Sequence, residues 1–533
     1  MAKKLMIQGT MSNSGKSFLV AALCRIFRQD GYRVAPFKSQ NMALNSYITK
    51  DGLEIGRAQA MQAEAAGIAP TVDMNPILLK PTSQMGSQVI VNGEVYGNLK
   101  AMEYYRRKPE FIPVIREAFA RLEEQYDIIV LEGAGSPAEI NLRDNDIVNM
   151  GMAKLADAPV LLVGDIDRGG VFASLYGTVS LLEPEEQARI KGLLINKFRG
   201  DVKILELGLR MIEERLHIPV LGVIPMEQID LDDEDSLSDR LSQVGSGQSA
   251  GDASANGLDI AVIHLPHISN FTDFNALEQF GGVALRYVNR AAQLGKPDLI
   301  LLPGTKNTMA DLAWLRESGL EAAIAHQVSE KIPLIGICGG YQMLGERLAD
   351  PEQVEHGGTM RGMGLLPAET IFASRKTRTQ IQGVMQAAAG MYAEGAELPV
   401  VGYEIHMGVT RLCDVPESDA QGSALTSALA PASAHPAMSS THPSATPAIL
   451  LEDGRLDGLV RDDGLVFGSY LHGLFDNEAW TEALLSHLAK KKGISLETTG
   501  ESRKDYKERQ YDKLADLVRS SLDLEAIYRL MEE

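Results

Sequence analysis

Cysteine is scarce in this sequence. Its 533 residues include only Cys24, Cys338 and Cys413, which stand far apart. Three separated cysteines provide neither a disulfide framework nor a CxxC pair for a metal ion. This usage is typical of a reducing compartment, so we expect a cytoplasmic protein.

Long apolar runs are also missing. The apolar stretch at residues 5–7 is too short for the core of a signal peptide, and no run of 18 apolar residues follows it. We therefore expect a soluble chain without a membrane partner.

Positive charge is in the minority. Lys and Arg total 51 against 71 Asp and Glu, which gives a net charge of -20. Such an acidic surface repels phosphate backbones, so we expect no nucleic-acid partner. Small anionic ligands are not excluded, because loops and helix N-termini bind them locally.

Alternating strands and helices fill residues 1–230 and predict the first domain, a doubly wound α/β unit with a mostly parallel sheet. The expected strands cover 4–8, 33–37, 127–132, 159–164, 191–196 and 219–223. The expected helices cover 15–29, 56–66, 110–125 and 202–216. Residues 231–257 are acidic and then rich in Ser and Gly, which indicates a linker.

A second α/β pattern covers residues 258–499 and predicts another doubly wound domain. Its expected strands are 258–263, 298–302, 332–337 and 465–470. The stretch from about 414 to 448 is rich in Ser, Ala, Pro and Thr, so we expect a disordered insertion there. Residues 500–533 are charged with a helical pattern, and we expect this tail to pack as a terminal helix.

A phosphate-binding loop is indicated near the N-terminus. The first predicted strand leads into Gly-Thr10-Met-Ser-Asn-Ser-Gly15-Lys16-Ser17 and then an apolar helix. Strand, glycine-bearing loop, Lys-Ser and helix is the P-loop context, although Thr10 stands where the commonest spacing has glycine. We expect Thr10, Gly15, Lys16 and Ser17 to bind ATP, with Ser17 also on Mg²⁺. A structural turn with a chance Gly-Lys-Ser is the alternative.

Glu132 ends the apolar strand predicted at 127–132 and is followed by Gly-Ala-Gly. A strand-end carboxylate in a P-loop domain suits the second protein ligand of Mg²⁺. A solvated strand-end glutamate fits the local sequence equally well. The P-loop in the same domain favours the functional interpretation, so the predicted metal ligands are Ser17 and Glu132.

A cysteine elbow is the sharpest motif in the chain. Residues 332–337 are mainly apolar, end in Gly-Ile, and are expected to form a buried strand. Cys338, Gly339 and another glycine follow directly, and a helical pattern comes after them. Glycines on both sides permit the tight turn that exposes a nucleophile, and the following helix favours a thiolate. Backbone N–H groups of Gly339 and of Gly304, after another predicted strand, could form an oxyanion hole.

The elbow needs a histidine as its base. His472 follows the apolar strand predicted at 465–470 and is our choice. His406, in the sequence Gly-Tyr-Glu-Ile-His-Met-Gly, is the main competitor.

These motifs together resemble two known groups of enzymes. The N-terminal loop is similar to that of dethiobiotin synthetase and its amidoligase relatives, and the elbow with its late histidine resembles class I glutamine amidotransferases. Leu474 stands where most of that class has a glutamate that orients the histidine, which is typical of the cobyric acid synthase branch. Nearly the whole chain resembles that family, most closely at 37–42, 74–81, 133–137, 164–170, 196–200 and 402–408.

The resemblance implies a function. Members amidate the b, d, e and g carboxylates of adenosylcobyrinic acid a,c-diamide, using ATP and glutamine, in adenosylcobalamin biosynthesis. Cys338 and His472 would then release ammonia from glutamine, while Lys38 and Lys80, beside family-like motifs, would hold a substrate carboxylate or a phosphate. A homo-oligomer is compatible with this function.

Three alternatives stay open. The sister cobyrinic acid a,c-diamide synthase performs the same chemistry on other carboxylates. A lipid II amidating enzyme combines similar activities, usually in two chains. The third is a non-enzymatic P-loop switch protein with an inactive glutaminase-like domain, against which the intact Cys338 and His472 argue.

Overall fold

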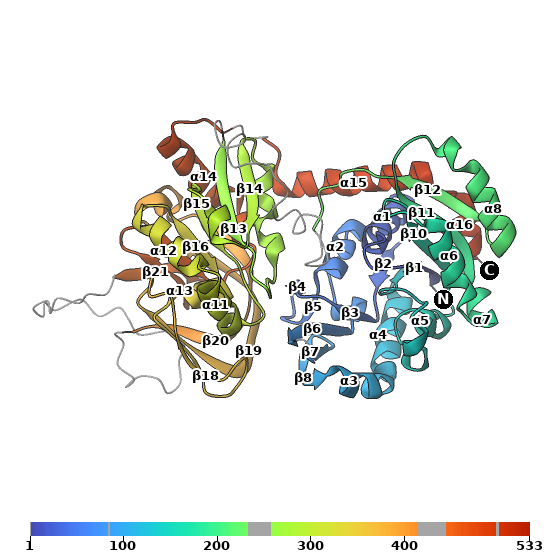
Figure 1. Ribbon diagram of the computed structural model, residues 1–533, viewed down its shortest axis with the longest axis horizontal. Helices are drawn as coiled ribbons and strands as arrows, with labels where there is room; N and C mark the ends of the chain where they lie inside the picture. The colour runs from blue at the N-terminus through green and yellow to red at the C-terminus, as the bar shows by residue number, and fades with distance from the viewer. Residues whose placement is uncertain (1, 84–85, 233–256, 414–443, 497–499, 533) are drawn as a thin grey trace, which may run out of the picture. The chain divides into compact units, whose positions relative to one another are not determined.

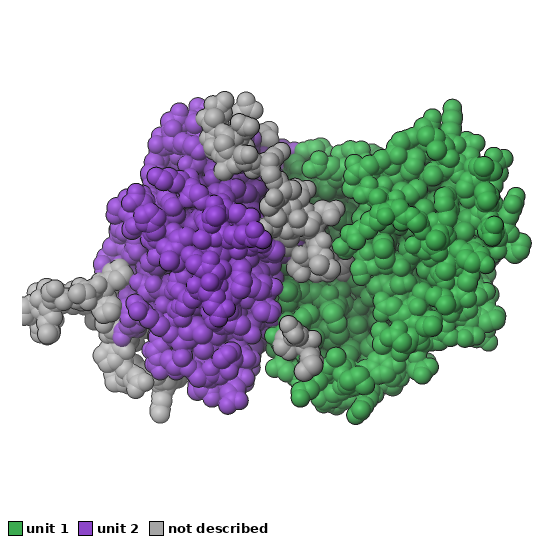
Figure 2. Space-filling model, viewed as in Figure 1, with its two compact units in different colours: residues 1–49, 53–234, 504–533 green, residues 50–52, 235–503 purple. Residues whose placement is uncertain are grey.

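A computed structural model describes residues 2–83, 86–232, 257–413, 444–496 and 500–532. The chain divides into two compact units (Figure 2). Unit 1 comprises residues 1–49, 53–234 and 504–533, and unit 2 comprises residues 50–52 and 235–503. Among the described residues, every helix is too short or too polar to span a bilayer.

A six-stranded parallel sheet forms the centre of unit 1 (Figure 1). Its order is β12 (Val220–Pro225), β11 (Ile190–Phe198), β10 (Val160–Asp165), β1 (Lys3–Gly9), β9 (Ile128–Glu132) and β2 (Val34–Phe37). These six strands lie within one or two residues of the predicted ones. Each is mainly apolar, as expected for strands buried on both faces.

Helices cover both faces of this sheet, because alternate strand residues point to opposite sides. Met6 and Leu162 lie in one core with α4 (Ile112–Gln125), α5 (Met150–Ala156), α6 (Val171–Ser180) and α8 (Glu206–Leu216). Leu5 and Leu161 lie in the other core with α1 (Lys16–Gln29), α2 (Arg57–Ala66), α15 (Arg503–Ser521) and α16 (Leu524–Leu530). The doubly wound class is confirmed.

Along the chain, the segment between β2 and β9 forms two small sheets that were not predicted. One has the order β3 (Gln40–Met42), β6 (Ile77–Ser83), β7 (Gly86–Val91) and β8 (Glu94–Lys100). The other pairs β4 (Ser46–Ile48) with β5 (Glu54–Gly56). β3, β4 and β5 have only three residues each, too few to leave a clear period-two pattern in the sequence, whereas the longer strands β6, β7 and β8 were simply missed.

Unit 2 has an 11-stranded sheet with a parallel core. The core order is β14 (Val283–Val288), β13 (Leu258–Ile263), β15 (Leu299–Leu302), β16 (Leu334–Ile337) and β23 (Val466–Ser469). Beyond β23 the sheet continues through antiparallel pairs. These strands are β22 (Leu456–Arg461), β21 (Ala445–Leu451), β19 (Ala368–Met385) and β20 (Pro399–Leu412), and β17 (Arg347–Asp350) and β18 (Gly358–Arg361) complete the sheet.

The α/β class of unit 2 is confirmed, although the strand pairs beyond β23 are antiparallel apart from the parallel pair of β17 with β19. Helices α11 (Thr308–Glu317), α12 (Leu320–Ser329), α13 (Gly339–Leu344) and α14 (Glu478–Lys492) contribute to its hydrophobic core. Residues 414–443 of the expected insertion lie outside the described residues, but 445–448 belong to β21, so the insertion ends earlier than predicted.

The linker boundary needs one correction. Leu231 and Asp232, placed in the linker by their acidic neighbourhood, are buried in unit 1. Asp232 accepts hydrogen bonds from Arg57, with Nη2 at 2.5 Å. Buried pairing thus extends unit 1 past residue 230, and residues 233–256 lie outside the described part of the chain.

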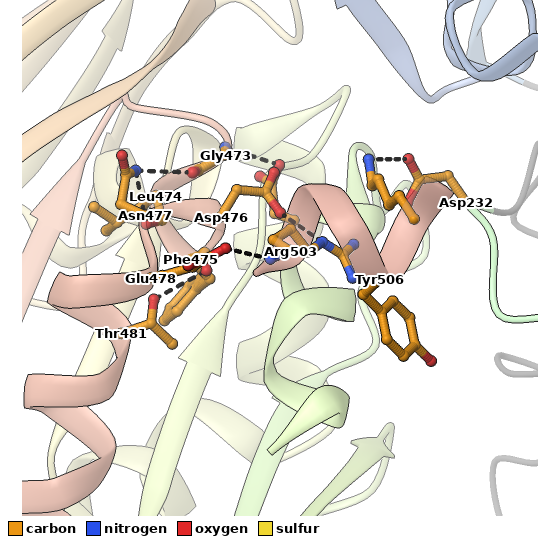
Figure 3. Close-up of polar contacts among 12 residues, drawn as sticks. Asp232, Gly473, Leu474, Phe475, Asp476, Asn477, Glu478, Thr481, Arg503 and Tyr506 are labelled. Carbon is orange, nitrogen blue, oxygen red and sulfur yellow. Dashed lines mark hydrogen bonds and ion pairs between the residues drawn. The ribbon is translucent and has the colours of Figure 1, made fainter. Parts of the chain in front are cut away.

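The C-terminal tail is helical and packed, as expected, but the unit that it joins was not predicted. From residue 504 onward it belongs to unit 1, where Tyr511 and Leu514 are buried in the core that contains α1. Its first helical residue, Arg503, belongs to unit 2 and forms an ion pair with Asp476 at 3.3 Å (Figure 3). Burial of one apolar face offsets the cost of ordering this helix.

Candidate active sites

The phosphate loop connects β1 to α1 and is held in place from β11. Gly15 has φ +93°, and a Cβ there would lie 2.1 Å from Nδ2 of Asn196, so only glycine fits. The same Asn196 nitrogen donates to the Ser14 carbonyl at 2.9 Å. Lys16 Nζ donates to the carbonyls of Met11 at 2.9 Å and Gly135 at 3.3 Å, across the loop. The structure therefore has a preformed loop in the P-loop context.

Glu132 lies at the centre of a buried polar network beside this loop. Its side chain accepts from Ser17 Oγ at 2.9 Å, Lys38 Nζ at 2.8 Å and Gln62 Nε2 at 2.5 Å. Glu132 is 1% exposed, so the alternative of a solvated glutamate is wrong. The predicted residues Ser17, Lys38 and Glu132 come together, whereas Gln62 was missed.

Two predicted residues of unit 1 have other surroundings. Lys80 Nζ donates to Glu54 and to Ser46 Oγ, both at 2.9 Å, so its charge is compensated away from Glu132. Thr10 lies in the loop, and its buried hydroxyl has no hydrogen-bond partner among the described residues. A buried hydroxyl without a partner is costly unless a ligand satisfies it.

The elbow of unit 2 has the predicted geometry. Cys338 lies between β16 and α13 with φ 52° and ψ -109°, a strained conformation for a residue with a side chain. A Cβ on Gly340 would lie 2.0 Å from the Leu302 carbonyl, so the turn requires glycine there. Cys338 is 7% exposed, and its thiol donates to the Ile405 carbonyl at 3.5 Å.

His472 has a carboxylate partner that the sequence did not reveal. Its Nδ1 donates to Oδ2 of Asp273 at 2.7 Å, and the Gly473 N–H donates to the other oxygen at 3.2 Å. Asp273 lies in the 3-10 segment η5 (Phe271–Gln279), far from His472 in the sequence. Asp273 thus takes the orienting role of the glutamate that Leu474 replaces.

The charge state of His472 follows from these neighbours. Burial alone would lower the pKa of His472, but the charge and hydrogen bond of Asp273, with the interaction with Cys338, raise it to about 10. The ring stacks on Tyr403 with centroids 5.2 Å apart. Its buried Nε2 has no hydrogen-bond partner among the described residues. His472 is therefore an imidazolium at neutral pH, beside Cys338.

His406 has a different environment. Its Nδ1 donates to the Gly408 carbonyl at 3.0 Å, and its ring stacks on Tyr470 with centroids 3.6 Å apart. Burial lowers the pKa of His406 to about 3, so the ring is neutral at physiological pH. These contacts suit a packing role, and they favour His472 as the base.

The two loops predicted to form an oxyanion hole meet at the elbow. A Cβ on Gly339 would lie 3.0 Å from the backbone nitrogen of Thr305, and one on Gly304 would lie 3.3 Å from Cε1 of His472. The absence of side chains at both glycines allows these backbone segments to lie close together beside the elbow and His472.

The chain matches two family models and many full-length relatives. Residues 5–236 match the CobQ/CobB/MinD/ParA nucleotide binding domain, and residues 259–480 match the CobB/CobQ-like glutamine amidotransferase domain. The cobyric acid synthase of Lachnoclostridium phytofermentans is 54% identical over 539 residues, covering 100% of both chains. That of Yersinia enterocolitica is 52% identical, covering 99% of this chain and 98% of its own. The chain therefore belongs to the cobyric acid synthase family, whose members are glutamine-hydrolysing, ATP-dependent amide ligases.

Proposed function

We propose that this chain amidates the b, d, e and g carboxylates of adenosylcobyrinic acid a,c-diamide, taking nitrogen from glutamine and energy from ATP. The observation that carries the proposal is an ordered Cys338–His472–Asp273 site in the same chain as a P-loop with a buried strand-end carboxylate. The full-length similarity to cobyric acid synthases supports the corrinoid substrate. The cysteines, which form no disulfide, fit a cytoplasmic enzyme.

In unit 1 the chemistry is phosphoryl transfer to a carboxylate. A carboxylate oxygen attacks the γ-phosphorus of ATP, ADP leaves, and an acyl phosphate forms. Lys16 would neutralise charge on the phosphates, and the loop amides would hold them in line. Lys38, beside Glu132, is placed to attract a second anionic group.

Ser17 and Glu132 fit a magnesium ion. Their oxygens are 2.9 Å apart, and a hydroxyl with a carboxylate is the hard-oxygen donor set that Mg²⁺ prefers. The described residues contain no cluster of three or more His, Cys, Asp or Glu for a metal, so phosphate oxygens and water would complete the shell. When bound, Mg²⁺ would offset the charge that develops on the phosphates.

In unit 2 the chemistry is thioester formation. The Cys338 thiolate attacks the side-chain amide carbon of glutamine, Gly304 and Gly339 would stabilise the oxyanion, and His472 donates its proton to the departing ammonia. His472 then takes a proton from water, whose oxygen attacks the thioester and releases glutamate. The ammonia displaces phosphate from the acyl phosphate and gives the amide.

A substrate-omission assay tests the proposal. Corrinoid product should require cobyrinic acid a,c-diamide, ATP and glutamine together, with free ammonium replacing only glutamine. The same assay with unamidated cobyrinic acid separates this activity from a,c-diamide synthesis. Turnover of cobyrinic acid but not of its a,c-diamide would refute the proposal.

A further inference from the structure

A cavity of about 150 Å³ lies beside the phosphate loop in unit 1. Gly15 of the loop and Phe18 and Leu19 of α1 form one side of it. The remaining lining comes from the ends of β11 and β12, the segment after β12, and α15: Asn196, Lys197, Ile224, Pro225, Met226, Glu227, Ile229, Leu514, Leu517 and Val518.

The wall from α15 is firmly attached to unit 1. Arg25 of α1 donates to Asp512 at 2.8 Å, and Tyr511 donates to Glu64 of α2 at 2.9 Å. Leu514 and Val518 are buried in the core shared with α1, whereas Leu517 is only half-buried. A half-buried leucine that lines a cavity presents apolar surface to whatever fills that cavity.

The lining suits a flat heteroaromatic ring. Apolar side chains from α1, β12 and α15 supply the surfaces, and Asn196 and Lys197 add polar groups near the phosphate loop. Mainly apolar walls with a few polar groups are typical of small-molecule pockets. A nucleotide whose phosphates occupy the loop carries its base at the opposite end, and this cavity adjoins the loop at Gly15.

We propose that α15 forms one wall of the pocket for the base of the nucleotide, so that the C-terminal tail is part of the nucleotide site. Neither family model reaches this helix, because they end at residues 236 and 480. The inference rests on the proposed function only in taking ATP as the nucleotide. It assigns to Leu517 a direct contact with the base.

A matched pair of tryptophan substitutions tests this. Leu517→Trp fills the cavity, whereas Ser520→Trp adds the same side chain on the exposed face of the same helix. Binding of Mg·ATP and of magnesium tripolyphosphate, which lacks base and sugar, is measured by calorimetry. Leu517→Trp should weaken ATP binding about tenfold or more and leave tripolyphosphate unchanged. Ser520→Trp should change neither.

Two outcomes would overturn the inference: unchanged ATP affinity in Leu517→Trp, or equal loss for ATP and tripolyphosphate, which would make α15 merely structural. Thermal unfolding checks that the variants are folded. If Leu517→Trp does not fold, Leu517→Ala decides, because it removes the contact and should weaken ATP alone by a few-fold. A wild-type chain that binds ATP through this pocket yet fails to amidate the a,c-diamide would refute the proposed function and leave this inference standing.

Discussion

The phosphate site of unit 1 and the cysteine site of unit 2 both lie at the carboxyl ends of parallel strands, but they are assembled differently. Lys16 and Ser17 are the first residues of α1, directly after the phosphate loop, and Glu132 ends the neighbouring strand β9. Cys338 and His472 follow the adjacent strands β16 and β23, while Asp273 comes from a third segment. Phosphate binding uses local backbone, whereas covalent catalysis needs side chains that converge from distant segments.

The electrostatics of the two sites differ in the same way. The carboxylate of Glu132 accepts hydrogen bonds from several side chains, which include the ammonium of Lys38. This mixture of charges suits the binding of phosphate groups with a metal cation beside them. His472 depends on one buried carboxylate, and its pKa is raised to about 10. Because the cysteine site depends on fewer charged contacts, a single substitution should change its electrostatics more than a single substitution changes those of the phosphate site.

Cys338→Ala should separate the activities of the two sites most clearly. Without the thiol no thioester forms, so glutamine-dependent amidation should fall below detection while ammonium-dependent amidation persists. Product formation with each nitrogen source measures this. Cys413→Ala, at an exposed cysteine, is the control. Loss of both activities in a folded Cys338→Ala enzyme would contradict the separation.

Lys16→Ala should have the opposite pattern. Amidation should fall about 10²–10³-fold with either nitrogen source, because the acyl phosphate must form before nitrogen attacks. Glutamine hydrolysis measured alone should persist. Lys191→Ala, at an exposed position of β11, is the matched control. Full turnover of Lys16→Ala with ammonium would remove the loop from the mechanism.

The two histidines of unit 2 should separate clearly. His472→Ala should lower glutamine hydrolysis about 10²–10⁴-fold, because it removes the proton carrier. His406→Ala should keep most of this activity, since the neutral ring packs on Tyr470. Each hydrolysis rate is compared with the ammonium-dependent rate of the same variant. If His406→Ala stops hydrolysis and His472→Ala does not, the two roles must be exchanged.

Asp273→Asn tests the cause of the raised pKa. In the wild type the imidazolium of His472 persists from neutral pH up to about pH 10. Removing the carboxylate charge lowers that pKa, so the imidazolium is lost at lower pH. The rate of glutamine hydrolysis, measured across a range of pH, should therefore begin to fall at a lower pH in Asp273→Asn than in the wild type. An unchanged pH profile would exclude Asp273 as the positioning residue.

The smallest effect is expected from the segment rich in Ser, Ala and Pro. Replacing residues 414–443 with a short Gly/Ser loop should leave both activities within a few-fold, because this composition cannot offset the entropy of ordering. Initial rates with glutamine and with ammonium measure the change. A severe loss in a stable variant would assign the segment to substrate binding.

Local patterns predicted much of this molecule. The strand expected at 4–8 is Lys3–Gly9, and the helix expected at 15–29 is Lys16–Gln29. Apolar periodicity and the residues that end each element lie within a short window, so they can be read directly. The P-loop and the elbow could be predicted for the same reason, because each is a single continuous turn between a strand and a helix.

The choice of partners was decided only by the tertiary structure. Nothing near His472 identifies Asp273 among the 71 acidic residues, because the pair depends on which loops meet at the edge of the sheet. Likewise, the sequence predicts that the tail packs as a helix, but only the structure shows that Leu514 packs in the core of unit 1. The sequence by itself determined the elements and the reactive groups. Long-range packing decided their partners, because burial and charge compensation depend on neighbours that are distant along the chain.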